Sequence, residues 1–407
     1  MREWLRLQGG QGVDVLKVAQ QKRRPWSGLT GRARQSGQAG RDGDDFSHQV
    51  YDAMSGCLAC KSCAGQCPIK VDVPEFRSRF LELYHTRYRR PLRDYVMASL
   101  EFVMPAAAKF PAVFNGLMKQ SWVRQAMASG LGIVDSPLLS RLDIAAALEA
   151  HGVRHASVPE LEALDPAERA RSVILVPDSF TYLFETEQMV PLIELATRLG
   201  YRVWMAPLKP NGKPLHVQGF LKTFNRVARR NSEHLSGLAR TGIALVGLDP
   251  AMTLVYRQEY LKVPGLTQVP EVLLPQEWLA RVWPRAGKTE TAPQTVTYRL
   301  LPHCTERTNA PASVGQWQEV FAKAGLSLQV EASGCCGMSG TYGHEARNYE
   351  TSRVIFEQSW KNALDASGVS ADAEPLATGY SCRSQVKRFG AREIRHPLQA
   401  LLAHARL

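Results

Sequence analysis

Residues 57–68 read CLACKSCAGQCP, and this stretch determines what the first folded part of the chain is built around. Its cysteines Cys57, Cys60, Cys63 and Cys67 follow the spacing C-x2-C-x2-C-x3-C, with a proline directly after the last one. Three thiolates on one tight loop reach three corners of a [4Fe–4S] cube, and thiolates suit iron. Zinc sites usually show two separated cysteine pairs instead. The spacing therefore favours iron–sulfur over zinc or disulfides.

The same motif indicates that a ligand is missing. In two-cluster ferredoxins the cysteine before the proline ligates the other cluster, so Cys67 is expected to serve a second cluster. The cluster at Cys57, Cys60 and Cys63 then needs its fourth ligand from a companion motif. No second motif of this kind occurs in the 407 residues. We therefore expect the site to be incomplete within this chain.

The residues around the motif predict helices. The segment VPEFRSRFLELYHTRY places Phe76, Phe80, Leu83 and Tyr84 on one helical face, with arginines on the other. We expect residues 45–165 to form an all-helical, ferredoxin-like iron–sulfur domain.

Beyond a linker expected at LDPAERAR, strands alternate with helices. SVILVPD, YRVWMAP and TGIALVGLDP are predicted strands within residues 170–290, and TVTYRLLPHC, SLQVEASGCCG and PLATGYSC are predicted strands within residues 291–407. The order of elements is the same in both parts, which indicates a duplicated α/β unit. The expected fold class is α plus α/β, with two cysteine-rich-type repeats of which the first has lost its cysteines.

A second cysteine set lies in the last repeat. Cys304, the pair Cys335–Cys336 and Cys382 all stand at the carboxyl ends of predicted strands, where open α/β sheets build their sites. A second iron–sulfur centre or a thiol redox site is the favoured interpretation. A structural zinc and a set of reduced, buried thiols remain as alternatives.

Two histidines accompany this set. His303 precedes Cys304, and His344 follows the cysteine pair. Either residue is a candidate ligand or proton carrier, because imidazole serves both roles. We expect a structural role for both.

Composition limits the other function classes. A chain of 407 residues with 44% apolar and 22% charged residues suits a soluble protein of two or three domains. The net charge is +12, from 50 basic and 38 acidic residues. Residues 1–44 form a basic, linker-like segment that we interpret as solvated. No interleaving of basic and aromatic residues supports a nucleic-acid partner.

No membrane-spanning segment is predicted. The most apolar window, residues 97–118, is interrupted by Glu101, Pro105, Lys109 and Pro111. The amino terminus lacks the apolar core of a signal peptide. We expect a cytoplasmic location, either free or peripheral at the inner face of the membrane.

Several stretches together carry a family resemblance. CLACKSCAGQCP, VDVPEFRSRFLELYHTRY, LLPHCTERT, GCCGMSGTYGHE and GYSCRSQVKR resemble the iron–sulfur part of bacterial FAD-linked D-2-hydroxyacid dehydrogenases, most closely those acting on D-2-hydroxyglutarate. The chain is more distantly similar to the iron–sulfur subunits of glycolate oxidase and anaerobic glycerol-3-phosphate dehydrogenase, and to heterodisulfide reductase. The resemblance extends from Arg2 onward and is weakest between Lys22 and Asp44.

The resemblance implies an electron-transfer module that passes electrons from flavin to an acceptor such as a quinone. In the family, the flavin domain and a first Cys-Pro cluster motif precede the motif that matches Cys57 to Pro68. FAD is therefore expected on an upstream domain or a separate subunit. The chain is expected to begin at an internal methionine of a larger enzyme. Alone, it is expected to do no substrate chemistry. The competing hypothesis is a zinc-stabilised binding or scaffold protein without redox activity.

This chain departs from the family pattern at one position. The cysteine-rich pattern usually closes with Cys-x-x-Cys, whereas here Gln385 follows Cys382 at the second place. The four thiols available to a second centre are then those of Cys304, Cys335, Cys336 and Cys382.

Overall fold

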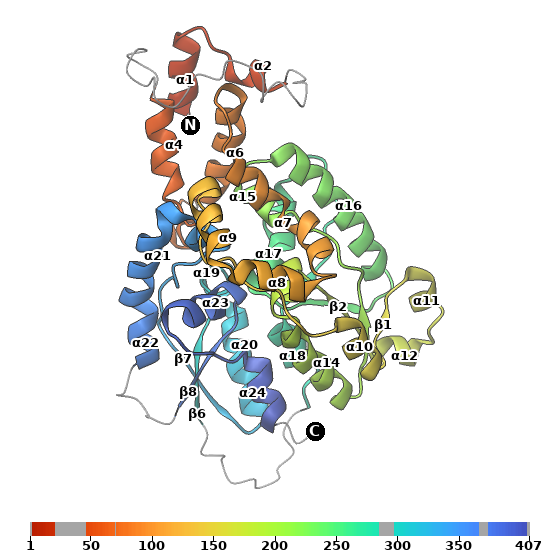
Figure 1. Cartoon of the computed structure of the whole chain (residues 1–407). Helices are drawn as coiled ribbons and strands as arrows, with labels where there is room; N and C mark the ends of the chain where they lie inside the picture. The colour runs from red at the N-terminus through yellow and green to blue at the C-terminus, as the bar shows by residue number, and fades with distance from the viewer. Residues whose placement is uncertain (1, 21–45, 70, 285–296, 366–372, 405–407) are drawn as a thin grey trace. The chain divides into compact units, whose positions relative to one another are not determined.

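The computed structural model describes residues 2–20, 46–69, 71–284, 297–365 and 373–404 (Figure 1). Most of the segment 1–44, expected to be linker-like and solvated, lies outside the described residues. For residues 2–20 this expectation is wrong, because they form two helices that place Trp4 and Val15 in an apolar core. The chain forms two compact units. The first comprises Met1–Leu100 and Lys213–Phe224, and the second comprises Glu101–Gly212 and Asn225–Leu407.

The first unit is helical throughout its described residues. Its helices are α1 (Arg2–Gly10), α2 (Val15–Gln20), α4 (Ser47–Ser55), α5 (Ser62–Gln66), α6 (Val73–Arg87) and α15 (Lys213–Val217), with the first part of α7 (Leu92–Ala107) and the start of α16 (Leu221–Ala239). Trp4 packs edge-on against Phe80 at a centroid distance of 5.1 Å. These two rings, with Leu81 and Tyr84, anchor a small apolar core.

Helix α6 buries the expected face only in part. Phe80 and Tyr84 are buried as predicted, whereas Phe76 and Leu83 are only half-buried. Arg77 is also buried and does not lie with the exposed arginines. Its guanidinium donates to Met54 O (3.1 Å) and Val217 O (2.6 Å), at the carboxyl ends of α4 and α15. The negative ends of two helices thus offset the cost of burying the charge.

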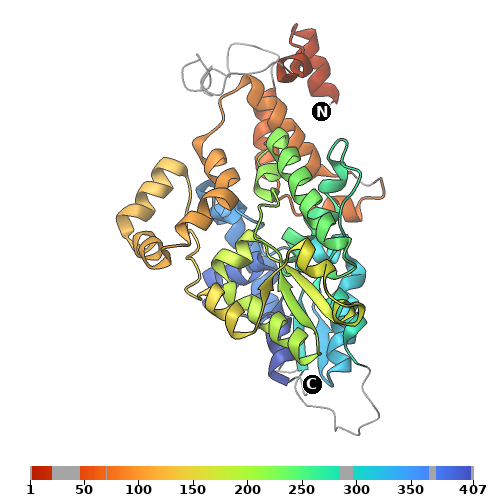
Figure 2. The same cartoon turned by 90° about the vertical axis from the view of Figure 1, so that its right-hand side faces the viewer.

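The second unit contains two parallel sheets. Their strands are β1 (Arg154–His155), β2 (Ser172–Val176), β3 (Arg202–Met205), β4 (Ala244–Gly247), β5 (Val272–Leu273), β6 (Thr297–Leu301), β7 (Ser327–Val330) and β8 (Glu374–Ala377). The strand orders are β1-β3-β2-β4-β5 and β7-β6-β8, and every pairing is parallel. Figure 2 shows the five-stranded sheet (yellow to green) with helices around it. The expected mixed α/β class is confirmed, and the chain is mostly helical.

Helices connect and cover these strands. They are α8 (Pro111–Lys119), α9 (Ser121–Ala126), α10 (Ile144–Ala150), α11 (Val158–Glu162), α12 (Pro166–Ala170), α13 (Ser179–Phe184), α14 (Met189–Arg198), α17 (Pro250–Arg257), α18 (Pro275–Val282), α19 (Cys304–Asn309), α20 (Pro311–Lys323), α21 (Tyr349–Phe356), α22 (Asn362–Asp365), α23 (Tyr380–Phe389) and α24 (Pro397–His404). Among the described residues, no helix combines the length and apolarity that crossing a membrane requires.

Two local expectations are wrong. The stretch expected as a linker, LDPAERAR, contains helix α12, because Asp165 and Glu168 form a reciprocal capping box at its start. Residues 154–155 form strand β1 on the edge of the five-stranded sheet, although they lie in the segment expected to be all-helical. A two-residue strand has too few residues to show a period.

The two α/β halves, residues 172–282 and 297–404, repeat one topology. The order β3-β2-β4 in the first half matches β7-β6-β8 in the second. Left-handed glycines recur 125 residues apart, Gly200 (φ 79) with Gly325 (φ 75) and Gly212 (φ 83) with Gly337 (φ 86). The turns between equivalent strands therefore share backbone geometry as well as order.

The halves also exchange their last helices. Helix α18 of the first half packs on α20 of the second, and α24 of the second half packs on α14 of the first (Figure 1). Lys323 Nζ donates to Ala280 O (2.7 Å), and Arg198 Nη1, 125 residues earlier than Lys323, donates to Leu402 O (3.4 Å). A single apolar core accordingly runs through both sheets.

Candidate functional site

The three parallel strands of the second half bring the later cysteines to one edge. Cys304 is the first residue of α19 after β6, the pair Cys335–Cys336 lies in the loop after β7, and Cys382 lies in α23 after β8. Because β6, β7 and β8 are parallel neighbours, their carboxyl ends meet at the same edge of the sheet. The structure thus gathers four thiols from three separate loops.

Contacts between the sulfurs link the four cysteines in a row. Hydrogen bonds from Cys304 and Cys336 lower the pKa of Cys335 to about 3, and Cys336 in turn contacts Cys382. The contacts with Cys335 and Cys382 hold the pKa of Cys336 well above its usual value. Across the described residues, no three His, Cys, Asp or Glu side chains already form an ion-binding arrangement. The four thiols lie near one another, but they do not surround a common point as the ligands of one metal ion would.

Gly337 shapes the loop that presents the cysteine pair. Its φ is 86, and a Cβ at this position would lie 2.3 Å from Ser352 O, so only glycine fits. Its backbone N–H donates to Cys335 Sγ at 3.3 Å. A backbone donor directed at a thiolate, on a loop that excludes side chains, suits a sulfur-ligated group.

Gln385 supports this loop from the position where the family pattern has a cysteine. It is fully buried, and its Nε2 donates to Ser352 Oγ at 2.8 Å. Ser352 Oγ donates in turn to Gly337 O at 2.8 Å. The glutamine therefore holds the loop through Ser352, a role that no pattern in the sequence indicates.

The two histidines are engaged in structural contacts. The Thr305 N–H donates to His303 Nδ1 at 3.1 Å, which caps α19, and His303 Nε2 lies 3.2 Å from Ser381 Oγ. His344 Nδ1 lies 3.2 Å from Val134 O. Burial lowers the pKa of His344 to about 4, so its ring is neutral at physiological pH. These contacts favour the structural role expected for both residues.

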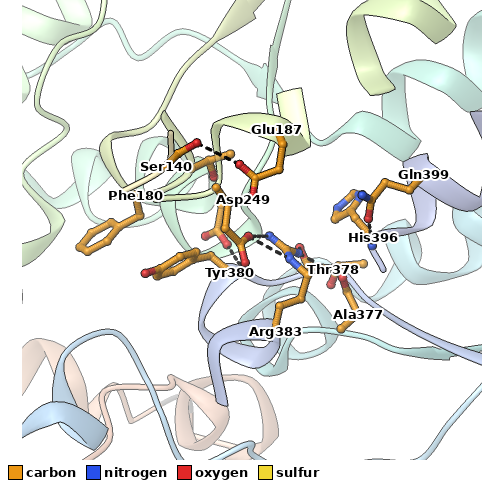
Figure 3. Close-up of polar contacts among 12 residues, drawn as sticks. Ser140, Phe180, Glu187, Asp249, Ala377, Thr378, Tyr380, Arg383, His396 and Gln399 are labelled. Carbon is orange, nitrogen blue, oxygen red and sulfur yellow. Dashed lines mark hydrogen bonds and ion pairs between the residues drawn. The ribbon is translucent and has the colours of Figure 1, made fainter. Parts of the chain in front are cut away.

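A buried polar network that the sequence did not reveal surrounds Cys382. Arg383 donates to Ala377 O (3.1 Å), Thr378 O (3.0 Å) and Glu185 Oε2 (3.0 Å). Asp249 Oδ2 accepts the Tyr380 N–H at 2.8 Å, and Figure 3 shows Asp249 beside Tyr380. Arg383, the residue after Cys382, thus carries a buried charge that pairs with a carboxylate of the first half, Glu185, and with two carbonyl oxygens of its own half.

A further buried carboxyl group lies two residues beyond Cys304. Glu306 accepts hydrogen bonds from Gln276 Nε2 (2.7 Å), Trp317 Nε1 (3.2 Å) and Thr378 Oγ1 (2.6 Å). Burial raises its pKa to about 7 despite these donors. The network fixes the start of α19, and with it Cys304.

The first cysteine set lies on a loop between α4 and α6 in the helical unit. Ala59 (φ 54) and Lys61 (φ 61) both adopt left-handed conformations, which are strained for residues with a Cβ. The Ala59 N–H lies 3.5 Å from Cys57 Sγ, the same donor arrangement as at the second set. Two strained residues and an inward-facing N–H indicate a loop shaped around its sulfurs.

The thiols of this set are half-buried and close to one another. Burial raises the pKa of Cys57, and the nearby Cys60 and Cys63 contribute in the same direction. Cys67 follows at the end of α5, where its N–H donates to Cys63 O at 3.0 Å. The structure therefore groups Cys57 with Cys60 and Cys63.

Both sets offer only thiol donors, and soft thiolates fit an iron–sulfur cluster better than a hard cation. The backbone donors at Ala59 and Gly337 add support from the protein side, because hydrogen bonds to sulfur are one of the levers by which proteins tune such clusters.

Known proteins match the whole chain. A D-2-hydroxyglutarate dehydrogenase of Pseudomonas putida is 59% identical over 406 residues, covering 100% of this chain and 39% of that protein. The Escherichia coli protein of the same name is 43% identical over 99% of this chain and 39% of its own length. The chain thus spans about 39% of the length of these relatives.

A more distant relative is similar in extent to this chain. It is one of the subunits of the anaerobic glycerol-3-phosphate dehydrogenase of Escherichia coli, and it is 26% identical over 90% of this chain and 91% of its own length. No family model matches the chain. No solved structure matches it either.

Proposed function

Because the chain is homologous to the C-terminal part of bacterial D-2-hydroxyglutarate dehydrogenases, we propose that it is the iron–sulfur electron-transfer part of an FAD-linked D-2-hydroxyacid dehydrogenase. The observation that carries this proposal is the convergence of Cys304, Cys335, Cys336 and Cys382 at one sheet edge, in a chain that also holds a C-x2-C-x2-C-x3-C-P motif. D-2-hydroxyglutarate is the proposed substrate of the whole enzyme, since the relatives' names state it.

Each cysteine has a role in this proposal. Cys57, Cys60 and Cys63 hold three corners of a [4Fe–4S] cluster, and Cys67 ligates a companion cluster whose motif lies outside this chain. When bound, the cluster supplies a one-electron carrier. The strained loop and the Ala59 N–H hold the thiols in place.

The later cysteine set forms a second iron–sulfur centre in our proposal. Gly337 keeps the loop free of a side chain, and Gln385 positions that loop through Ser352. The sulfur-only donor set favours iron–sulfur, while zinc is the alternative occupant because four thiolates also satisfy tetrahedral zinc.

The proposed domain organisation follows from the same features. Within the expected segment 45–165, we assign the ferredoxin-like helical part to the residues up to Leu100, because Glu101 and the residues after it belong to the unit that holds the sheets. A cysteine-rich-type repeat without cysteines spans residues 170–290, and the complete repeat spans residues 291–407. The shared strand order, the matched glycines and the exchange of helices support a common origin of the two repeats.

The proposed partners follow from the relatives' greater length. A flavin-containing domain or subunit delivers electrons to this chain, and a quinone or another carrier accepts them. The chain alone is expected to do no substrate chemistry. The proposed location is cytoplasmic, either free or peripheral at the inner face of the membrane. The exposed side chains of Phe110, Val113 and Trp122, close in sequence to Lys109 and Lys119, favour the peripheral contact.

Anaerobic purification tests the proposal. We expect a brown protein with iron and acid-labile sulfide, from which Cys57→Ser and Cys304→Ser each remove a different part of the metal. A colourless protein with stoichiometric zinc, unchanged by reductants and oxidants, would support the zinc-stabilised scaffold instead.

A further inference from the structure

The first α/β half has no thiol at the positions equivalent to the second cysteine set. Ser179 and Asn211 stand 125 residues before Cys304 and Cys336. Met252 follows the end of β4 by five residues, as Cys382 follows the end of β8. The sheet edge that gathers sulfur in the second half must therefore be filled differently in the first.

Glu101 fills it. This side chain belongs to the part of α7 that lies in the second unit, and it is 2% exposed. Its Oε2 accepts the Gly212 N–H at 2.8 Å, and its Oε1 accepts the Asn211 N–H at 3.2 Å. Ser179 lies close enough to lower the pKa of the same carboxyl group. The carboxyl group thus lies beside Asn211 and Ser179, the equivalents of two of the cysteine positions.

One backbone donor has an equivalent in the other half. Gly212 (φ 83) and Gly337 (φ 86) occupy equivalent places, seven residues after β3 and β7. The Gly337 N–H donates to Cys335 Sγ, whereas the Gly212 N–H donates to the Glu101 carboxylate. One inward-facing donor therefore meets sulfur in one half and oxygen in the other.

Other residues fix this loop independently of Glu101. Tyr260 Oη donates to Asn211 O at 2.9 Å, and Asn211 Nδ2 donates to Met252 O at 3.2 Å. Asn231 Nδ2 donates to Tyr260 Oη at 3.2 Å. Successive backbone N–H groups held in this way form an anion-binding concavity. Side chains other than Glu101 thus help to hold this loop, and the Glu101 carboxyl group accepts its two N–H groups.

We propose that the first half retains a carboxylate-binding nest in place of a metal site, and that Glu101 occupies this nest from within the chain. The half is then redox-silent, and an internal carboxyl group accepts the hydrogen bonds of backbone donors whose equivalent faces sulfur in the other half. Burial raises the pKa of Glu101 to about 7 against the opposing effect of the two N–H groups. The comparison with a metal site rests on the proposed function, whereas the nest itself rests on the hydrogen bonds of Glu101.

Removing the internal carboxylate and supplying a free one tests the nest. Glu101→Ala leaves the two N–H groups without an acceptor, and we expect a fall in Tm on the order of 5 °C. Sodium formate should restore the loss in a saturable manner, whereas sodium chloride at equal ionic strength should not. The wild-type chain and Glu149→Ala, an exposed position, should show neither effect.

A second variant separates shape from charge. Glu101→Gln fills the same volume but has one acceptor oxygen for two N–H groups, so its Tm should fall without any response to formate. The nest is refuted if Glu101→Ala melts like the wild type, or if formate and chloride act equally on it. It is also refuted if Glu101→Gln melts like the wild type, and this outcome can be read even when the alanine variant fails to fold.

Discussion

At the residue scale, Gly337 carries more of the second site than its lack of a side chain suggests. Its left-handed backbone turns the cysteine pair, its N–H donates to Cys335 Sγ, and its carbonyl accepts from Ser352. The space where a Cβ would stand is already taken by Ser352 O. Backbone conformation and close packing therefore coincide at one position.

We predict that Gly337→Ala costs about 2 kcal/mol or more of unfolding free energy, because strain and a backbone clash add. It should also lower the iron bound by the second cysteine set without affecting the first. Gly340→Ala is the matched control: its φ is 63, but nothing lies within 4 Å of an added Cβ. Thermal unfolding and iron analysis check both, and equal losses in the two variants would contradict the steric argument.

Residue types and spacing predict the cysteine loops, because ligation depends on thiols at short separations along the chain. The partners of buried charges could not be predicted. Helical period places Arg77 on an exposed face, yet two helix ends hold it inside. In the sequence Glu101 only interrupts an apolar window, yet its carboxyl group accepts hydrogen bonds from two backbone N–H groups. Both roles depend on segments far apart in the sequence.

At the element scale, local signals are reliable where they are long. The strands β2, β3 and β4 and the helix before Gly200 follow apolar runs that the sequence displays over five or more residues. The edge strands β1 and β5 have two residues each and carry no such signal. The capping box of α12 is visible as Asp165 and Glu168, but the helix has only five residues, too few to show a helical period.

We predict that Asp165→Ala destabilises the chain by about 1 kcal/mol, because it removes the side-chain acceptor of the Glu168 N–H at the start of α12. Glu162→Ala is the control, since this exposed residue ends the preceding helix and caps nothing. Chemical denaturation measures both. An Asp165→Ala midpoint equal to that of the control would mean that α12 adds nothing to stability.

At the scale of the whole molecule, the exchange of α18 and α24 joins the two halves into one core. Arg383 and Asp249 add polar links between the halves next to Cys382. The complete repeat therefore depends on the repeat that has lost its cysteines. This dependence gives a physical reason for the chain to keep a half without thiols.

The cluster proposed at Cys57, Cys60 and Cys63 in the helical unit takes its fourth ligand from a companion motif outside this chain. We predict that Cys67→Ser leaves the iron at Cys57, Cys60 and Cys63 unchanged in the chain alone, because Cys67 serves the companion cluster. In a complex with the flavin-containing part, the same variant should slow electron transfer to an added acceptor. Cys60→Ser is the control and should lose iron in either form. A loss of iron from Cys67→Ser in the chain alone would assign Cys67 to the local cluster.

The sequence alone indicates which residues of this protein are candidate ligands and in which order its elements follow. Cysteine spacing, strand runs and turn glycines are local properties, and they predict the thiol loops, the mixed α/β class and the repeated order of elements. Only the tertiary structure decides which buried donors and acceptors form hydrogen bonds with one another. The Glu101 carboxylate meets the Asn211 and Gly212 N–H groups across 110 residues of chain. Burial makes such pairing obligatory, because an unsatisfied donor or charge costs free energy, but only the packed fold selects the partner.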